Sequence, residues 1–255
     1  MLLIEAKNIC FSYSNKEVLS EVDFELRKGD VLSLLGENGC GKTTLLKILM
    51  GLYECEGEVK ILSKNIKEYS HKELAKLISY VPQTHSIPFE YTVYEVVLMG
   101  RLSHINLFSN YSQKDKKIAL ECLEKVGISH LKNCIYSQIS GGQRQLTFIA
   151  RALTQESKII FMDEPVTGLD YGNQLKLLTF LKELSKEGYT FVQTTHYPDH
   201  ALYASNKVMM LQNAEVLDKG YVNTKLTQKT IKRLYDVDVE IISRQNGYKY
   251  CIPTL

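Results

Sequence analysis

One stretch of this sequence has a fixed chemical meaning: Gly36-Glu37-Asn38-Gly39-Cys40-Gly41-Lys42-Thr43, followed by Thr44. It fits the pattern G-x-x-x-x-G-K-[ST] between a strand-like apolar run at 31–35 and a helix-like run at 44–50, the context of a phosphate-binding loop. The glycines let the backbone wrap around an anion, and the helix N-terminus adds positive potential. Lys42 is expected to reach the β- and γ-phosphates, and the Thr43 hydroxyl to bind Mg²⁺. The alternative is a glycine-rich turn before a core helix, but the complete pattern predicts binding of a nucleoside triphosphate.

The composition is that of an ordinary globular protein. The chain has 255 residues, of which 44% are hydrophobic, so it can bury a large core. The net charge of +2 gives no indication of a nucleic-acid partner. The six cysteines are scattered, which argues against a zinc site or a disulfide framework and fits a reducing cytoplasm. A charge at Glu5 comes too early for a signal peptide, and no run approaches about 20 apolar residues, so we expect other subunits to span any membrane.

Apolar spacing predicts an α/β fold that begins with an antiparallel β layer. Alternation predicts half-buried strands at 2–6 and 22–27, with a polar turn at 11–15 between them. Further strands are expected at 57–62, 78–81, 158–162, 189–194, 207–212 and 214–218. Near the C-terminus we expect one short helix past Thr227 and a hairpin, 237–242 with 248–252, around an Asn246-Gly247 turn.

Helices are predicted between the strands, above all from about 84 to 140. Capping boxes, which mark helix N-termini, are expected at Ser70, Thr92 and Ser140. A helix from Ser112 is expected to carry Ile118, Cys122 and Val126 on one face and to stop near Gly127. The helix after the strand at 158–162 is expected to bury Leu177, Leu178, Leu181 and Leu184 and to end at Gly188. We therefore expect a helical subdomain inserted into an α/β core.

Two acids follow a predicted buried strand. Asp163 is suited to hold Mg²⁺ beside the nucleotide, and Glu164 to polarise a water that attacks the γ-phosphate. The alternative is that the two acids lie on a solvated loop. The buried strand before them and the phosphate loop elsewhere in the chain favour the functional interpretation. His196 also ends a predicted strand, and by itself it is more typical of a core histidine.

The segment Ile139-Ser140-Gly141-Gly142-Gln143 resembles the signature L-S-G-G-Q of ATP-binding-cassette (ABC) ATPases, with Ile139 in place of leucine. The phosphate loop, this signature, the Asp163-Glu164 pair, the 168–170 turn and His196 occur in that family's order, and the similarity covers residues 1–220. The resemblance implies an α/β P-loop NTPase core, with an N-terminal antiparallel β layer and an inserted α-helical subdomain.

The resemblance also implies roles for individual residues. Each ATP would lie between one subunit's phosphate loop and Ser140, Gly141, Gly142 and Gln143 of a second copy, in a head-to-tail homodimer. Tyr13 would stack on adenine, Gln83 would touch Mg²⁺ and the attacking water, and Asp170 would communicate across the dimer. His196 would contact the γ-phosphate, and Glu164 would be the catalytic base. The alternatives are a surface tyrosine at Tyr13 and an ordinary capped helix at Ser140.

The same resemblance suggests a domain plan and a place within the family. Residues 1–83 and 141–220 would form the catalytic core, 84–140 the helical subdomain, and 221–255 a C-terminal appendage. The segment 88–101 resembles the ATPases of iron–siderophore, haem and cobalamin importers, and 101–108 and 140–146 look closest to those of molybdate or tungstate uptake. His104 is expected to be structural rather than a metal ligand.

An importer ATPase implies partners that this chain does not contain. A separate permease would dock near Gln83 and the helical subdomain at the cytoplasmic face of the cell membrane, with a substrate-binding protein as an indirect partner. No nucleic acid is expected. Two other functions stay open: a soluble cassette ATPase that acts on nucleic acid or ribosomes, which typically carries two cassettes or a coiled-coil insertion, and the ATPase of an exporter.

Overall fold

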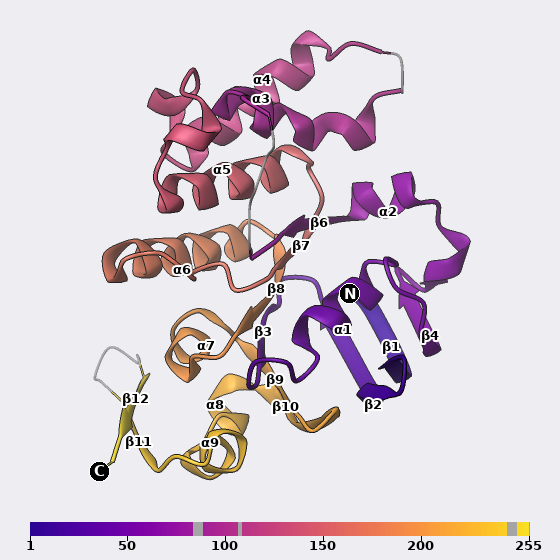
Figure 1. The fold of residues 1–255 in the computed structure, drawn as a ribbon, viewed down its shortest axis with the longest axis vertical. Helices are drawn as coiled ribbons and strands as arrows, with labels where there is room; N and C mark the ends of the chain where they lie inside the picture. The colour runs from indigo at the N-terminus through magenta and orange to yellow at the C-terminus, as the bar shows by residue number, and fades with distance from the viewer. Residues whose placement is uncertain (84–88, 107–108, 244–248, 255) are drawn as a thin grey trace. The chain divides into compact units, whose positions relative to one another are not determined.

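The structure is a computed structural model that describes residues 1–83, 89–106, 109–243 and 249–254. The predicted Asn246-Gly247 turn and parts of the segments 88–101 and 101–108 lie outside these residues. The chain divides into two compact units, one formed by 1–69 with 177–255 and the other by 70–176 (Figure 1). The three-part domain plan drawn from the sequence stays a prediction beside this division.

The first unit contains the expected antiparallel layer. Its sheet has the order β2 (Lys16–Arg27), β1 (Leu2–Tyr13), β4 (Glu56–Ile61) and β5 (Lys64–Asn65). β1 continues to Tyr13, where a turn was predicted from residue 11, because Phe11 still pairs with Leu19 and Tyr13 with Lys16. The turn is thereby shortened to the residues between β1 and β2.

A second sheet of the first unit carries the phosphate loop. β3 (Val31–Leu35) pairs in parallel with β8 (Thr190–Thr195) and with β9 (Lys207–Gln212), and β10 (Glu215–Tyr221) pairs antiparallel to β9. Every residue of β3 and β8 is buried, as is usual for parallel strands covered on both faces. Helix α1 (Lys42–Leu49) starts just after β3, and α6 (Tyr171–Lys186) buries the four leucines that the sequence predicts.

The C-terminal segment also belongs to the first unit. It contains α8 (Val222–Lys225), α9 (Gln228–Tyr235) and the antiparallel strands β11 (Val239–Ser243) and β12 (Lys249–Pro253). The helix past Thr227 and both hairpin strands are thus confirmed. Figure 1 shows this segment, in yellow, beside α7 (Pro198–Ala204).

The second unit combines two parallel strands with helices. β6 (Ile78–Val81) pairs with β7 (Ile159–Met162). The helices are α2 (His71–Leu77), α3 (Val93–Leu98), α4 (Gln113–Lys125) and α5 (Gly141–Thr154), with 3₁₀ turns at Met99–His104, Ser129–Leu131 and Tyr136–Gln138. All three predicted capping boxes are present. In the described part of 84–140, helices and turns predominate, and the one β contact is an isolated bridge.

The buried side of α4 is wider than the predicted face. Ile118, Cys122 and Val126 are half-buried, and Ala119 and Leu123 beside them are fully buried. Asp115 is buried on this helix as well, with 6% of its surface exposed. Apolar spacing does not reveal this carboxylate, whose partner is an arginine.

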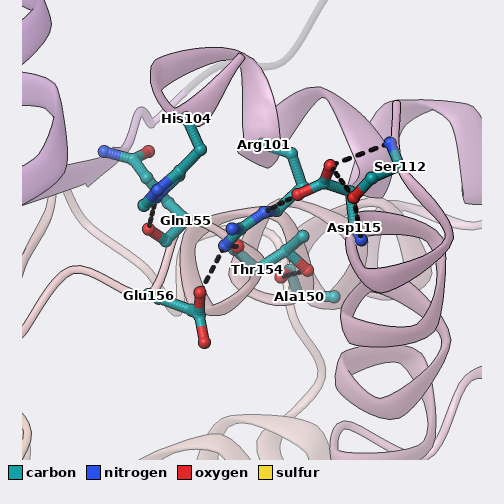
Figure 2. Close-up of polar contacts among 8 residues, drawn as sticks. All are labelled: Arg101, His104, Ser112, Asp115, Ala150, Thr154, Gln155 and Glu156. Atoms are coloured by element: carbon teal, nitrogen blue, oxygen red, sulfur yellow. Dashed lines mark hydrogen bonds and ion pairs between the residues drawn. The ribbon is translucent and has the colours of Figure 1, made fainter. Parts of the chain in front are cut away.

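That arginine is Arg101, and Figure 2 shows the polar network around it. Its Nε donates to Asp115 Oδ1 at 2.8 Å, and its Nη1 donates to the Thr154 carbonyl at 2.9 Å and to Glu156 Oε2 at 2.6 Å. The ring of His104 contacts the Gln155 carbonyl at 2.8 Å, which confirms its structural role. Arg101 itself is 4% exposed, so the network joins the start of α4 to the end of α5 inside the unit.

Replacing Arg101 by methionine should destabilise the second unit by about 3 kcal/mol, because it leaves the Asp115 carboxylate buried without its cation. Thermal unfolding followed by circular dichroism should show a midpoint lower by roughly 6 °C or more. Glu121→Ala is the matched control, since it breaks the exposed pair of Lys117 and Glu121 on the same unit, 3.7 Å apart, and should change stability by at most about 0.5 kcal/mol. Equal midpoints for the two variants would contradict the role of the network.

Asp115 also makes the fold sensitive to acid. The Ser112 hydroxyl, followed by Arg101, lowers the pKa of Asp115 from 3.8 to about 2. Because the folded pKa lies below the unfolded one, the ionised carboxylate stabilises the fold above about pH 4, and this contribution is lost as the pH falls through about 2. Urea unfolding at several pH values should show Asp115→Asn less stable than wild type at neutral pH, with a difference that shrinks between about pH 4 and pH 2. A constant difference would refute the assignment.

Candidate nucleotide site

The phosphate loop is packed tightly against its own unit. A Cβ at Gly36 would lie 2.4 Å from the Leu211 carbonyl oxygen of β9 and 2.5 Å from Cys40 Sγ. A Cβ at Gly41 would lie 2.8 Å from the Val18 carbonyl oxygen, and Gly41 has a φ of 104°. Side chains are excluded at both positions, so the backbone itself lies between β2 and β9.

Lys42 is folded over the loop that precedes it. Its Nζ donates to the Gly36 carbonyl at 2.7 Å and to the Glu37 carbonyl at 2.8 Å, and only 6% of the residue is exposed. The ammonium group is thereby held near the N-terminus of α1, where the helix dipole also favours negative charge. This concentration of positive potential fits a phosphate group.

A pocket of about 360 Å³ opens beside the loop. Its walls are Lys16, Glu17, Val18, Glu37, Asn38, Gly39, Cys40 and 211–214. Cys40 turns its sulfur inward, and burial raises the pKa of the thiol although Lys42 opposes the shift. The thiol is therefore protonated near neutral pH.

The predicted adenine contact, Tyr13, belongs to a group of three aromatic rings. It lies edge-on to Phe11 at 4.9 Å and to Tyr53 at 6.0 Å, and Phe11 stacks on Tyr53. Its hydroxyl is 3.4 Å from Thr44 Oγ1 in α1, and 46% of the residue is exposed. An exposed ring fixed by two neighbours is suited to stacking on a planar base.

His196 follows β8 in the same unit. Its ring centroid lies 4.0 Å from that of Tyr197, which in turn lies 4.8 Å from His200. Burial, and then the charge of His196, lower the pKa of His200 to about 4, so His200 is neutral at physiological pH. His196 is thus held by α7 and its neighbours at the carboxyl end of a buried parallel strand, the edge where ligands bind in such sheets.

In the second unit, Asp163 directly follows β7. Its amide donates to the Val81 carbonyl at 2.9 Å, and its Oδ2 accepts from the Tyr80 hydroxyl at 3.4 Å. Only 4% of Asp163 is exposed. Burial, and then the charge of Asp163, raise the pKa of Tyr80, which keeps this hydroxyl a donor. A buried carboxylate at a strand end is suited to bind a nucleotide-bound cation.

Glu164 has a constrained conformation. Its backbone is left-handed, with a φ of 45°, which costs a residue with a Cβ of order 1 kcal/mol. Its Oε2 accepts from Gln83 Nε2 at 2.9 Å and from Thr167 Oγ1 at 3.0 Å. The structure thus brings together two of the predicted catalytic residues, Gln83 and Glu164, within the second unit.

The predicted signature forms the N-terminus of α5. Ser140 is the N-cap, its Oγ accepts from the Gln143 amide at 3.3 Å, and Gln143 Oε1 accepts from the Ser140 amide at 3.0 Å. A Cβ at Gly141 would meet nothing within 4 Å, whereas one at Gly142 would lie 3.2 Å from Leu169. The capped helix therefore presents an open surface at Gly141.

Asp170 directly follows Leu169 and forms a turn with Asn173. Its carboxylate accepts from the Asn173 amide at 2.9 Å and from Asn173 Nδ2 at 2.6 Å. The Asn173 backbone is the main cause of the lowered pKa of Asp170. The side chain caps the start of α6 and stays ionised.

Sequence patterns missed three contacts of the site. Tyr80 and Thr167 hold the two acids, and Lys47 donates to the Tyr53 hydroxyl at 3.3 Å beside Tyr13. The alternation of β6 marks Tyr80 as a strand residue but does not indicate its partner across the strand pair. Such side-chain contacts depend on register and can be found only in the folded chain.

The residues present fit Mg²⁺ bound together with a nucleotide rather than a metal held by protein alone. Within the described ranges, no group of three or more His, Cys, Asp or Glu residues could hold a metal ion. Magnesium is usually bound by one or two carboxylates with phosphate oxygens, and Asp163 supplies a buried carboxylate of this kind.

Comparison with known proteins assigns the chain to a family. The family described as "ABC transporter" matches residues 19–167, more than half of the chain. The molybdate import ATP-binding protein MolC of Haemophilus influenzae is 35% identical over 249 residues, covering 96% of this chain and 92% of that protein. The ferric enterobactin transport ATP-binding protein FepC of Escherichia coli is 32% identical over 241 residues, covering 94% of this chain and 89% of that protein.

A solved structure agrees with these relatives. A metal-chelate type ABC transporter in an inward-facing conformation matches with a TM-score of 0.88 and 32% identity, covering 100% of this chain and 98% of that chain. The chain belongs to the ABC transporter family as one of its ATP-binding subunits. It binds nucleotide and is an ATPase that drives transport. No helix among the described residues is long and apolar enough to cross a membrane.

Proposed function

We propose that the chain is the ATP-hydrolysing subunit of an importer that takes up a metal-containing substrate. The observation that carries the catalytic part is the contact of Glu164 Oε2 with Gln83 Nε2 at 2.9 Å, beside the buried Asp163. A carboxylate for the attacking water and an amide that senses nucleotide are thereby paired. The MolC and FepC relatives, named for the import of molybdate and of ferric enterobactin, support a molybdate or iron-chelate substrate. Haem, cobalamin and tungstate come only from the resemblance of the sequence.

The phosphate loop and its neighbours would hold the nucleotide. Backbone amides of 36–44 and the Lys42 ammonium bind the phosphates, and Tyr13 stacks on the base. Thr43, Gln83 and Asp163 would hold Mg²⁺, which supplies charge neutralisation at the phosphates.

Hydrolysis would depend on positioning and charge. Glu164 accepts a proton from the water that attacks the γ-phosphate, and Gln83 and Thr167 keep its carboxylate in one orientation. His196 donates to the γ-phosphate and stabilises its developing charge. The left-handed backbone of Glu164 supports a functional role for this residue, because strained conformations tend to occur where a side chain must point in one direction.

A second copy of the chain would complete each site. Ser140, Gly141, Gly142 and Gln143 of that copy contact the γ-phosphate, and Asp170 communicates across the interface. The support is physical: the capped N-terminus of α5 is a second anion-binding helix end, with an open surface at Gly141. ATP binding closes such a dimer, and hydrolysis releases it.

Closure of the dimer would drive a separate membrane permease. The permease docks near Gln83 and the helical segment 84–140, and a substrate-binding protein delivers the cargo to it. The ATPase is then peripheral, at the cytoplasmic face of the cell membrane. In this arrangement the imported substrate never touches the chain, so its class comes from the relatives alone.

Glu164→Gln tests the assignment of the base. The variant should bind ATP like wild type but hydrolyse it at least about 100-fold more slowly, because the amide cannot accept the proton. Size-exclusion chromatography with ATP and Mg²⁺ should show a trapped dimer. Glu183→Gln, an exposed carboxylate on α6, is the control and should retain full turnover. Turnover of Glu164→Gln near that of wild type would exclude Glu164 as the base.

Gly141→Ala tests the contribution of the second copy. The added methyl group meets nothing within the chain and suits a helix, so the thermal midpoint should stay the same or rise slightly, and ATP binding by the monomer should be unchanged. It occupies the surface proposed to face the partner's nucleotide, and ATPase activity should fall by at least about tenfold. Lys114→Ala, in the first turn of the capped helix α4, is the matched control. Wild-type activity of Gly141→Ala would argue against the head-to-tail site.

A further inference from the structure

The C-terminal segment 222–254 shares a hydrophobic core with the strand that leads into the phosphate loop. This core joins residues of five elements, β3, α7, β9, α8 and α9, and is formed by Leu35, Ala201, Val208, Met210, Val222, Leu226, Ile231 and Leu234. Leu35 directly precedes Gly36, and Ala201 lies in α7, which follows His196. Tyr235, Ile241 and Cys251 pack against the same core. The segment is therefore built onto the nucleotide-binding side of the first unit.

Two polar contacts fix this segment in place. Gln212, at the end of β9, donates its side-chain amide to the Arg233 carbonyl at 2.9 Å and holds the last turn of α9. At the other end, the Cys251 amide of β12 donates to Asp199 Oδ1 of α7 at 2.7 Å. Leu211, next to Gln212, is the residue whose carbonyl excludes a side chain at Gly36. The end of α9 is thus anchored beside the loop.

Tyr235 is the last residue of α9, and its hydroxyl is buried next to the loop. Burial, and then the Cys40 thiol, raise the pKa of Tyr235, while the Gly36 backbone amide lowers it. The Gly36 contact is too weak to be a hydrogen bond, and no described residue gives this hydroxyl a full partner. A buried hydroxyl without a partner costs about 1–3 kcal/mol, so the hydroxyl does not hold Tyr235 in place, and what this residue contributes comes from its ring.

We propose that Tyr235 is a positioning residue of the nucleotide site. Its ring packs against Gly36 and Cys40 and so holds the phosphate loop in its binding conformation. Gly36 is then enclosed by Leu211, Cys40 and the end of α9, which keeps the loop amides converging on the phosphates. The effect should be on nucleotide affinity rather than on the chemical step, because Tyr235 acts through the loop and not on Glu164. The inference rests on the proposed role of the loop.

Steady-state ATPase kinetics of the full chain test this inference. Tyr235→Ala should raise the KM for ATP about tenfold with kcat within about twofold of wild type, and Tyr235→Phe, which keeps the ring, should have a KM within about twofold. Val222→Ala is the matched control, because it removes volume from the same core in α8 rather than at the end of α9, and it should destabilise the segment without raising KM. If Tyr235→Ala does not fold, Tyr235→Leu takes its place.

Alkylation of Cys40 gives a second readout that does not use turnover. Without nucleotide, Tyr235→Ala should react with N-ethylmaleimide at Cys40 at least about fivefold faster than wild type, measured by peptide mass spectrometry against the exposed Cys134. Tyr235→Phe and Val222→Ala should match wild type. A Tyr235→Ala variant that equals Val222→Ala in KM and in Cys40 labelling would overturn the inference, whereas loss of ATPase activity in the wild-type chain would count against the proposed function instead.

Discussion

The nucleotide site depends on the close packing of the phosphate-loop backbone against the neighbouring strands. Gly36 lies so close to β9 that a Cβ would come within 2.4 Å of the Leu211 carbonyl oxygen, and Gly41 is held against Val18 of β2 in the same way. These contacts fix both ends of the loop by backbone packing, which leaves its amides free to face a ligand. Because β3 is buried along its whole length, the loop starts from a strand that cannot shift.

The positive charge of Lys42 is held in the loop by neutral acceptors that a phosphate can replace. Lys42 is nearly buried, and a buried ammonium group without acceptors would be unfavourable. The carbonyls of Gly36 and Glu37 satisfy it at 2.7 and 2.8 Å. A phosphate that enters the loop replaces these neutral acceptors by a charged one, so binding strengthens an interaction whose side chain is already in place.

Local patterns predicted much of this protein, and long-range contacts account for what they missed. The phosphate loop, the capping box at Ser140 and the buried leucines of α6 are encoded within a few residues, so spacing was sufficient to find them. The burial of Asp115 in α4 was missed, because it depends on Arg101, which lies on another element. The partner of Asp163 depends on strand register in the same way.

Two features of the structure run against local preference. Glu164 has a left-handed backbone, and glycine stands in the first turn of α5 at Gly141. Each costs the fold up to about 1 kcal/mol, and both fall within motifs that resemble those of nucleotide-binding proteins. A sequence selected only for stability would replace each of them by a residue that fits the local backbone. Their positions are explained if nucleotide binding, rather than stability, sets the identity of both residues.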